Sequence, residues 1–143
     1  MGCLLGSDTK LTLLAAGLIF MLALMLGVLK YWQIVVSDES RAHPYIDIAH
    51  RAALLYSFAT LLIAIFVELS AWSVGVNLVA AMVVVFFFVS AIASYIFHGI
   101  RRDTANQFEH PTRALELAMV LLIVGEIGGF AVIFLGFVVG QLL

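Results

Sequence analysis

Residues Val76 to Phe97 read VNLVAAMVVVFFFVSAIASYIF, a stretch without one charged side chain. A helix needs about 20 mainly apolar residues to cross the hydrocarbon core of a bilayer. Because hydrocarbon offers no hydrogen-bond partners, the backbone of such a stretch must pair its own polar groups, and over this length only a helix does so. The stretch therefore predicts a transmembrane helix.

Three more stretches meet the same criterion. Hydrophobic residues make up 64% of the 143-residue chain and charged residues only 11%, which is more apolar surface than a soluble core of this size can hide. That surface must face lipid. We therefore predict one all-α domain, an integral membrane bundle of four helices, with spans at residues about 11–36, 46–69, 76–98 and 112–142.

Proline marks where two of these helices begin. At the first helical position proline loses no hydrogen bond and already has the backbone angle that a helix requires. We expect the second helix to open at Pro44 and the fourth at Pro111, each of which directly follows a histidine.

Charge is concentrated in two polar islands, residues 38–51 and residues 98–116. They contain all four histidines, five of the seven Lys and Arg residues and six of the nine Asp and Glu residues. One uncharged hairpin separates the islands, so they should meet at the same membrane face. Basic residues favour the cytoplasmic side, and only Lys10 belongs to the other face. We expect a protein of a bacterial inner membrane with both islands in the cytoplasm.

Composition and motifs exclude several classes of function. The net charge of −2 argues against nucleic-acid binding, which needs an excess of Lys and Arg. The single cysteine, Cys3, excludes an intrachain disulfide and a thiolate metal cluster. The chain has no phosphate-binding loop, HExxH, CxxC or nucleophile elbow, so candidate chemistry rests on histidine, tyrosine and buried carboxyl groups.

His50 lies near the start of the second span and shares a helical stripe with Ala53, Leu54 and Ser57. An imidazole just below the membrane surface, with one nitrogen free, is a candidate axial ligand for haem iron. The small residues on its stripe leave room for a planar ligand or a close helix. The alternative is an interfacial histidine that caps or hydrogen-bonds a neighbouring loop.

Tyr95, His98 and Glu126 are the other candidates. Tyr95 and His98 are three residues apart on the third span and so share a face, where a hydroxyl beside an imidazole could polarise a substrate oxygen; the alternative for Tyr95 is the aromatic belt at the lipid boundary. Glu126 lies near the middle of the fourth span, where an ionisable group is a functional candidate. Its alternative role is that of a neutral acid hydrogen-bonded across helices.

The chain resembles a family of small four-helix membrane isomerases that comprises styrene oxide isomerase and hydroxylaminobenzene mutase. The matching segments are 41–44 (RAHP), 49–50 (AH) and 54–57 (LLYS), with a weaker match over 89–97, which ends in Tyr-aliphatic-Phe. By architecture the resemblance covers nearly the whole chain. The family's asparagine that would contact substrate is missing here, where residues 56–57 are Tyr-Ser.

This resemblance implies a cofactor and a reaction. The styrene oxide isomerase branch binds haem b through the histidine of the second span and uses the iron as a Lewis acid on an epoxide oxygen. His50 would then be the axial ligand, Tyr95 an orienting hydroxyl and His43 a second candidate ligand. The substrate would be a small apolar epoxide or related oxygen compound from the membrane, and the protein a homo-oligomer, a trimer by resemblance.

Two other functions remain open. The pair His50-Arg51 is similar to the His-Arg of succinate dehydrogenase membrane anchors, which implies a subunit for electron transfer with haem b and quinone; His98 would then be a candidate second ligand. The third possibility is a structural or assembly membrane protein without a cofactor. Three glycines of the fourth span offer surfaces for close packing in an oligomer, namely Gly125, Gly128 and Gly129.

Overall fold

The structure is a computed structural model that describes residues 4–143, so Cys3 lies outside the described residues. Residues 4–143 form four α-helices and no β-strand, which confirms the predicted all-α fold. Each helix is long and apolar enough to cross a membrane. The helices are α1 (Ser7–Val36), α2 (Pro44–Glu68), α3 (Val74–Arg101) and α4 (Arg113–Gln141).

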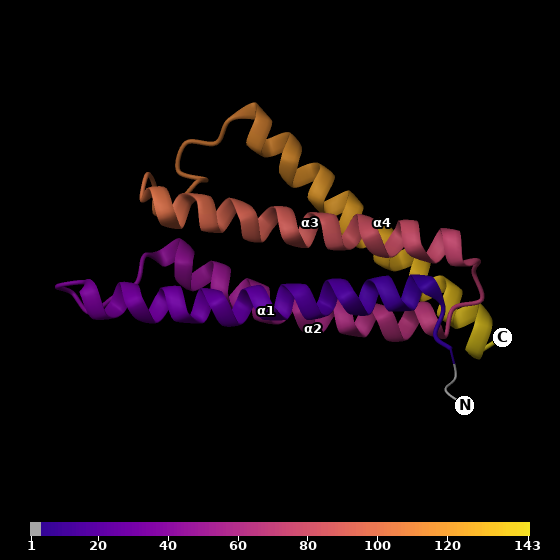
Figure 1. The fold of residues 1–143 in the computed structure, drawn as a ribbon. Coiled ribbons are helices and arrows are strands. Elements are labelled where there is room, and N and C mark those ends of the chain that lie inside the picture. The colour runs from indigo at the N-terminus through magenta and orange to yellow at the C-terminus, as the bar shows by residue number, and fades with distance from the viewer. Residues whose placement is uncertain (1–3) are drawn as a thin grey trace.

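Successive helices run in opposite directions along the bundle (Figure 1). α1 and α2 lie side by side, and α3 packs across both of them. The two polar islands lie together at one end, while the C-terminus and the short connection between α2 and α3 lie at the other. α4 meets α3 near its C-terminal half and diverges from it toward its N-terminus, which leaves a gap at the island end.

Capping residues fix where α2 and α4 begin. α2 starts at Pro44, as predicted, and the His43 side chain accepts a hydrogen bond from the Tyr45 backbone N–H. The prediction that α4 opens at Pro111 is wrong, because α4 starts at Arg113. The Thr112 side chain accepts from a backbone N–H in the first turn and therefore acts as the cap, which leaves the proline outside the helix.

α1 begins at Ser7, earlier than the apolar run predicts, because its polar first turn is buried against the other helices. The Asn77 side-chain amide donates to the Asp8 carboxylate at 3.2 Å, and the Thr9 hydroxyl donates to Glu68 at 2.6 Å. The helix can therefore include polar residues without leaving them unpaired. This cluster ties α1 to α2 and α3 at the end of the bundle opposite the islands.

Small residues allow the first three helices to approach closely. Ala23, Ala49, Ala53 and Ala81 have no exposed surface, and alanine at a helix contact brings the backbones together. In contrast, the only buried residues of α4 are Ile133 and Gly136. α4 is thus attached mainly through its C-terminal half.

Gly129 is predicted to be essential for the contact between α4 and α3. A methyl group at this position would lie 2.9 Å from the Ala80 backbone oxygen and 2.6 Å from Val84 Cγ2, so the helices would have to separate. Gly129→Ala should destabilise the fold by about 1–3 kcal/mol, as measured by thermal unfolding in detergent. The matched control is Gly128→Ala, whose methyl group meets no atom within 4 Å; equal melting temperatures for the two variants would contradict this prediction.

Candidate functional site

His50 lies against α1 rather than against a loop. Its Nδ1 is 2.9 Å from the backbone oxygen of Ala23. The ring also faces Gly27, where an added Cβ would be 3.0 Å from His50 Cε1. Glycine at this position is therefore what allows the imidazole to reach the α1 backbone.

This contact determines which His50 nitrogen is available. A carbonyl oxygen can only accept, so Nδ1 must carry the proton, and Nε2 then has a free lone pair. A backbone carbonyl that holds one ring nitrogen while the other is free to bind is the arrangement found for many metal-ligating histidines. His50 therefore has the hydrogen-bond geometry expected of a metal-ligating histidine.

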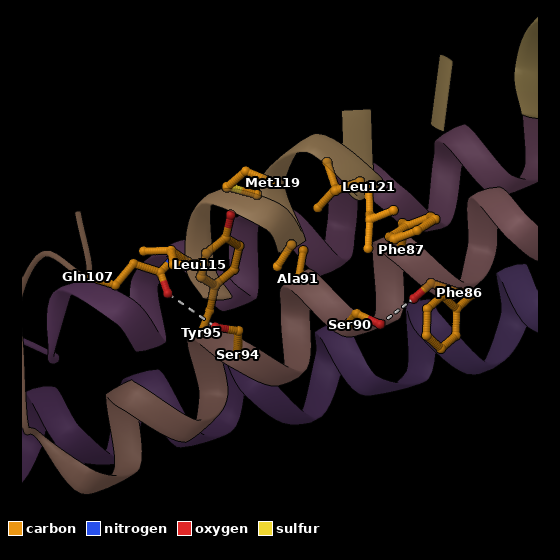
Figure 2. A pocket seen from close by; sticks show the side chains of 12 residues that line it. Phe86, Phe87, Ser90, Ala91, Ser94, Tyr95, Gln107, Leu115, Met119 and Leu121 are labelled. Carbon is orange, nitrogen blue, oxygen red and sulfur yellow. Dashed lines mark hydrogen bonds between the residues drawn. The ribbon is translucent and has the colours of Figure 1, made fainter. Parts of the chain in front are cut away.

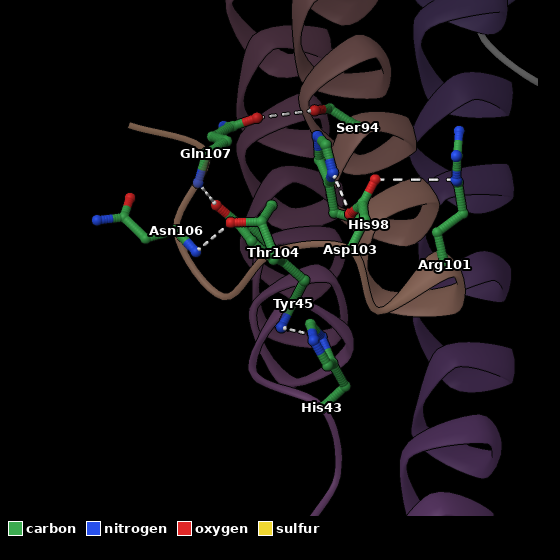
Figure 3. Close-up of polar contacts among 9 residues, drawn as sticks. All are labelled: His43, Tyr45, Ser94, His98, Arg101, Asp103, Thr104, Asn106 and Gln107. Atoms are coloured by element: carbon green, nitrogen blue, oxygen red, sulfur yellow. Dashed lines mark hydrogen bonds and ion pairs between the residues drawn. The ribbon is translucent and has the colours of Figure 1, made fainter. Parts of the chain in front are cut away.

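Tyr45 connects the two polar islands (Figure 3). Its hydroxyl accepts a hydrogen bond from the Gln107 backbone N–H at 2.7 Å. Its ring lies 5.9 Å from the Tyr95 ring and 5.5 Å from the His98 ring, centroid to centroid. These contacts confirm that the two islands meet at one end of the bundle and that Tyr95 and His98 share a face of α3. The sequence did not indicate the central position of Tyr45.

A carboxylate orients His98. Arg102 ends α3 in the left-handed conformation, with φ of 54°, and the chain turns back so that Asp103 Oδ1 lies 2.8 Å from His98 Nδ1. Arg101 adds a weaker contact to the other carboxylate oxygen at 3.8 Å. The pKa of Asp103 is lowered, mainly by the hydrogen bond that it accepts from His98. An aspartate–histidine pair of this kind can hold a general acid or base in a fixed orientation.

His43 is engaged in capping. Its Nδ1 accepts from the Tyr45 backbone N–H at 3.2 Å, and its own backbone N–H donates to Gln33 Oε1 at 2.9 Å. The pKa of His43 is lowered, mainly by burial and to a smaller extent by the positive charge of Arg102. The negative charge of Asp103 acts in the opposite direction. The neutral imidazole is thus the form that the fold requires as a cap.

Acidification should therefore weaken the fold through His43. Because its pKa is lower folded than unfolded, the folded protein binds fewer protons, and stability falls as the pH drops below about 6.5 toward the folded pKa. His43→Asn keeps a capping side chain but cannot titrate. The melting temperature of this variant should fall less between pH 7 and pH 5 than that of the unmodified chain, and identical pH profiles would contradict the assignment.

A cavity of about 280 Å³ lies between α3 and α4 (Figure 2). Its walls are mainly apolar, and the hydroxyl of Tyr95 points toward α4 beside Met119. The Ser94 hydroxyl donates to Gln107 Oε1 at 3.3 Å at the polar end of the cavity. Gln107 and Leu115 also line a second, polar cavity of about 490 Å³ that includes His98. Tyr95 is thus at an apolar cavity that adjoins a polar one.

Glu126 lies one helical turn from Leu122, which lines the α3–α4 cavity. Its Oε1 atom is buried and has no hydrogen-bond partner within residues 4–143. The charge of the Glu126 carboxyl group would act on the hydroxyls of Tyr95 and Tyr56. The Tyr56 ring stacks on the Phe88 ring, with 4.2 Å between the ring centroids. A buried acceptor without a donor costs about 1–3 kcal/mol, so a bound molecule with a hydrogen-bond donor would be stabilised here.

The predicted site residues do not form a single cluster. Tyr95 and His98 lie together at the island end, and Glu126 lies deeper beside the α3–α4 cavity. His50 contacts α1, on another face of α2. Within residues 4–143, no cluster of three or more His, Cys, Asp or Glu side chains is arranged to hold a metal ion.

Comparison with known proteins gives no guide to which of these groups acts. The chain matches no protein-family model, no curated protein and no solved structure.

Proposed function

We propose that the chain is an integral membrane protein with four spans and with both polar islands in the cytoplasm, in the inner membrane of a bacterium. Four long apolar helices with many large exposed apolar side chains support insertion, since lipid is the environment in which such a surface is stable. The gathering of basic residues at the island end supports the orientation.

Within this membrane protein, we propose a haem b-dependent isomerase that acts on a small apolar epoxide or related oxygen compound. The observation that carries the proposal is the His50 ring, held by the Ala23 carbonyl so that Nε2 is free. A neutral imidazole with this orientation suits an axial iron ligand. The resemblance to the isomerase family connects that ligand to the reaction.

The space beside Gly27 is occupied by the His50 ring. An apolar cavity of about 290 Å³ lies farther along the same two helices, between Phe20 and Phe58, and His50 does not line it. Haem, when bound, would supply a Lewis acid for the epoxide oxygen. His50 would hold it, and the apolar walls would keep water away.

The proposed rearrangement is balanced without a second substrate. One carbon–oxygen bond of the epoxide breaks, a hydride moves from the carbon that keeps the oxygen to the electron-poor carbon, and an oxygen electron pair forms the carbonyl. Tyr95 would donate a hydrogen bond to the oxygen while negative charge develops there. Glu126 would polarise the tyrosine hydroxyls from the inner end of the α3–α4 cavity.

His50 and Tyr95 lie on different helix faces of one chain, so a site that uses both would need a second copy of the protein. A head-to-tail ring of copies would bring the α1–α2 face of one protomer against the α3–α4 face of the next. We therefore propose a homo-oligomer, a trimer as the resemblance implies, in which neighbouring copies share each site. Gly128 supports close contact because nothing lies within 4 Å of it, whereas Gly125 and Gly129 are already used within the chain.

The proposal is tested by the absorption spectrum of protein purified from haem-replete cells and by incubation with styrene oxide. A Soret band together with conversion of styrene oxide to phenylacetaldehyde is expected. Protein with no Soret band would overturn both the isomerase and the electron-transfer alternative. The electron-transfer alternative needs a second axial ligand. His43 Nδ1 accepts from a backbone N–H, so the proton is on Nε2. His98 Nδ1 bonds to a carboxylate, as His50 Nδ1 bonds to a carbonyl, so His98 is the histidine to test for this role.

A further inference from the structure

The two cavities on the α3–α4 side of the bundle adjoin each other. The apolar cavity of about 280 Å³ and the polar cavity of about 490 Å³ share Gln107 and Leu115 as lining residues. The apolar cavity lies between the two helices (Figure 2), and the polar cavity lies at the loop that connects them (Figure 3). Together they form one site with an apolar part and a polar part, which is the shape of an amphiphilic molecule.

The apolar part has the dimensions of one hydrocarbon chain. Phe86 and Tyr95 both line it and are nine residues apart on α3. This spacing is about 13.5 Å along the helix axis, comparable to an extended alkyl chain of about ten carbons. Phe87 and Met119 add an aromatic ring and a flexible thioether to the wall, and both side chains adapt to apolar ligands. The volume is near the lower limit for ligand pockets, which favours one chain over the two chains of a phospholipid.

The polar part has an excess of negative charge. Among the described residues that line it, Asp103 and Glu109 are acidic and none is lysine or arginine. Arg101, which is not part of the lining, reaches one oxygen of Asp103 at 3.8 Å. Glu109 forms no ion pair within residues 4–143. The lowered pKa of Asp103 keeps its carboxyl group ionised at neutral pH, so the polar part favours a cation.

The hydrogen-bonding groups of the polar part favour a head that donates. His98 Nδ1 donates to Asp103, so the neutral imidazole has its lone pair on Nε2. This nitrogen and the two carboxylates are acceptors. An ammonium group has three donors and no acceptor, and its hydrogen bonds to carboxylates are charge-assisted. A carboxylate or phosphate head would instead be repelled.

We propose that the two cavities bind a single-chain amphiphile with a primary ammonium head, with its chain beside Phe87 and Tyr95 and its head at the end that holds Asp103 and Glu109. The site requires neither haem nor His50, so the inference goes beyond the proposed function and does not rest on it. A phospholipid with an ethanolamine head has the same ammonium group, but it also brings a phosphate and a second chain. While bound, the amine would exclude an epoxide from the apolar part.

The test compares three ligands with the same ten-carbon chain on the full-length protein in detergent at neutral pH. Decylammonium has a cationic head, decanol a neutral head and decanoate an anionic head. Native mass spectrometry counts the molecules bound to each chain at increasing ligand concentration. The ammonium should bind at least about tenfold more tightly than the alcohol, because it adds a charge-assisted hydrogen bond. Decanoate should bind more weakly than the alcohol, because the acidic residues repel it.

Variants separate the two parts of the site. The variant that combines Asp103→Asn and Glu109→Gln should bind decylammonium about tenfold more weakly. Its affinity for decanol should not change, which also shows that the variant is folded. Ala118→Leu places a larger side chain in the wall of the apolar part and should weaken the binding of both ligands. Asp38→Asn is the matched control, since it removes a carboxylate from the other island, where Asp38 lines a different cavity.

Several outcomes would overturn the inference. Decanoate binding as tightly as decylammonium, or an unchanged preference for the ammonium in the double variant, means that the acidic residues do not select the head. Failure of both decylammonium and decanol to bind means that the apolar part holds no chain. Tighter binding of a lysophosphatidylethanolamine with the same chain would assign the site to a phospholipid head. None of these measurements involves a Soret band or an epoxide, so the inference and the proposed function can fail separately.

Discussion

His50→Ala is expected to abolish the Soret band completely. The substitution removes the only bond that the proposal assigns between the protein and the iron, whereas the apolar walls alone give no axial ligand. Haem content per protein chain, measured as the pyridine haemochrome, should fall to background. Circular dichroism should stay unchanged, because His50 contributes only one side-chain hydrogen bond to the α1–α2 contact.

Other histidine variants separate the two haem-based functions. His43→Ala, His98→Ala and His110→Ala should retain haem, since the isomerase needs one protein ligand and an open position for substrate. If His98→Ala also removed haem, or changed a six-coordinate spectrum to a five-coordinate one, the iron would have two histidine ligands. The electron-transfer function would then replace the isomerase.

The position of the His50 ring can be tested without removing the imidazole. Gly27→Ala places a methyl group 3.0 Å from His50 Cε1, so the ring must shift away from α1. This variant should bind haem more weakly, by about tenfold, as expected for loss of the hydrogen bond that orients a ligating histidine. Gly75→Ala, on α3, is the control, because its methyl group meets no atom within 4 Å.

Activity should reappear when two inactive variants are combined. His50→Ala lacks the iron ligand, and Tyr95→Phe is expected to slow styrene oxide conversion about a hundredfold because one hydrogen bond to the developing charge is lost. If each site takes His50 from one copy and Tyr95 from the next, mixed rings contain some intact sites. In a trimer that contains both variants, about one site in three has both residues.

The experiment co-expresses the two variants with different affinity tags and purifies only mixed oligomers. Phenylacetaldehyde formation should then approach about a third of the unmodified rate, far above either variant alone. Activity equal to the mean of the two variants would show that each site belongs to a single copy. Unchanged turnover in Tyr95→Phe alone would assign Tyr95 to the aromatic belt.

The fold was largely predictable because hydrophobic runs separated by charged segments leave few alternatives in a membrane. The sequence pattern located all four helices and the meeting of the islands. It placed the start of α1 too late, because Asp8 and Thr9 are polar and were assigned to the segment before the helix. Their partners Asn77 and Glu68 are distant in sequence, and local hydropathy contains no information about such pairs.

The candidate site was predictable only where its geometry is local. Tyr95 and His98 share a face because they are three residues apart on one helix. The role of Tyr45 depends on residues of the other island, and the separation of His50 from Tyr95 depends on which neighbour each face of α2 contacts. Both properties arise from helix packing, which a single sequence does not specify.

The hydrogen bond between His50 and Ala23 has a mechanical consequence. Its acceptor belongs to the peptide backbone, so no exchange of side chain at position 23 can remove it. Displacement of α1 along its axis can, since each residue of a helix advances by about 1.5 Å. The spectrum of an iron bound to His50 would therefore report the sliding of α1, and membrane tension or thickness that moves this helix should be visible as a shift in colour.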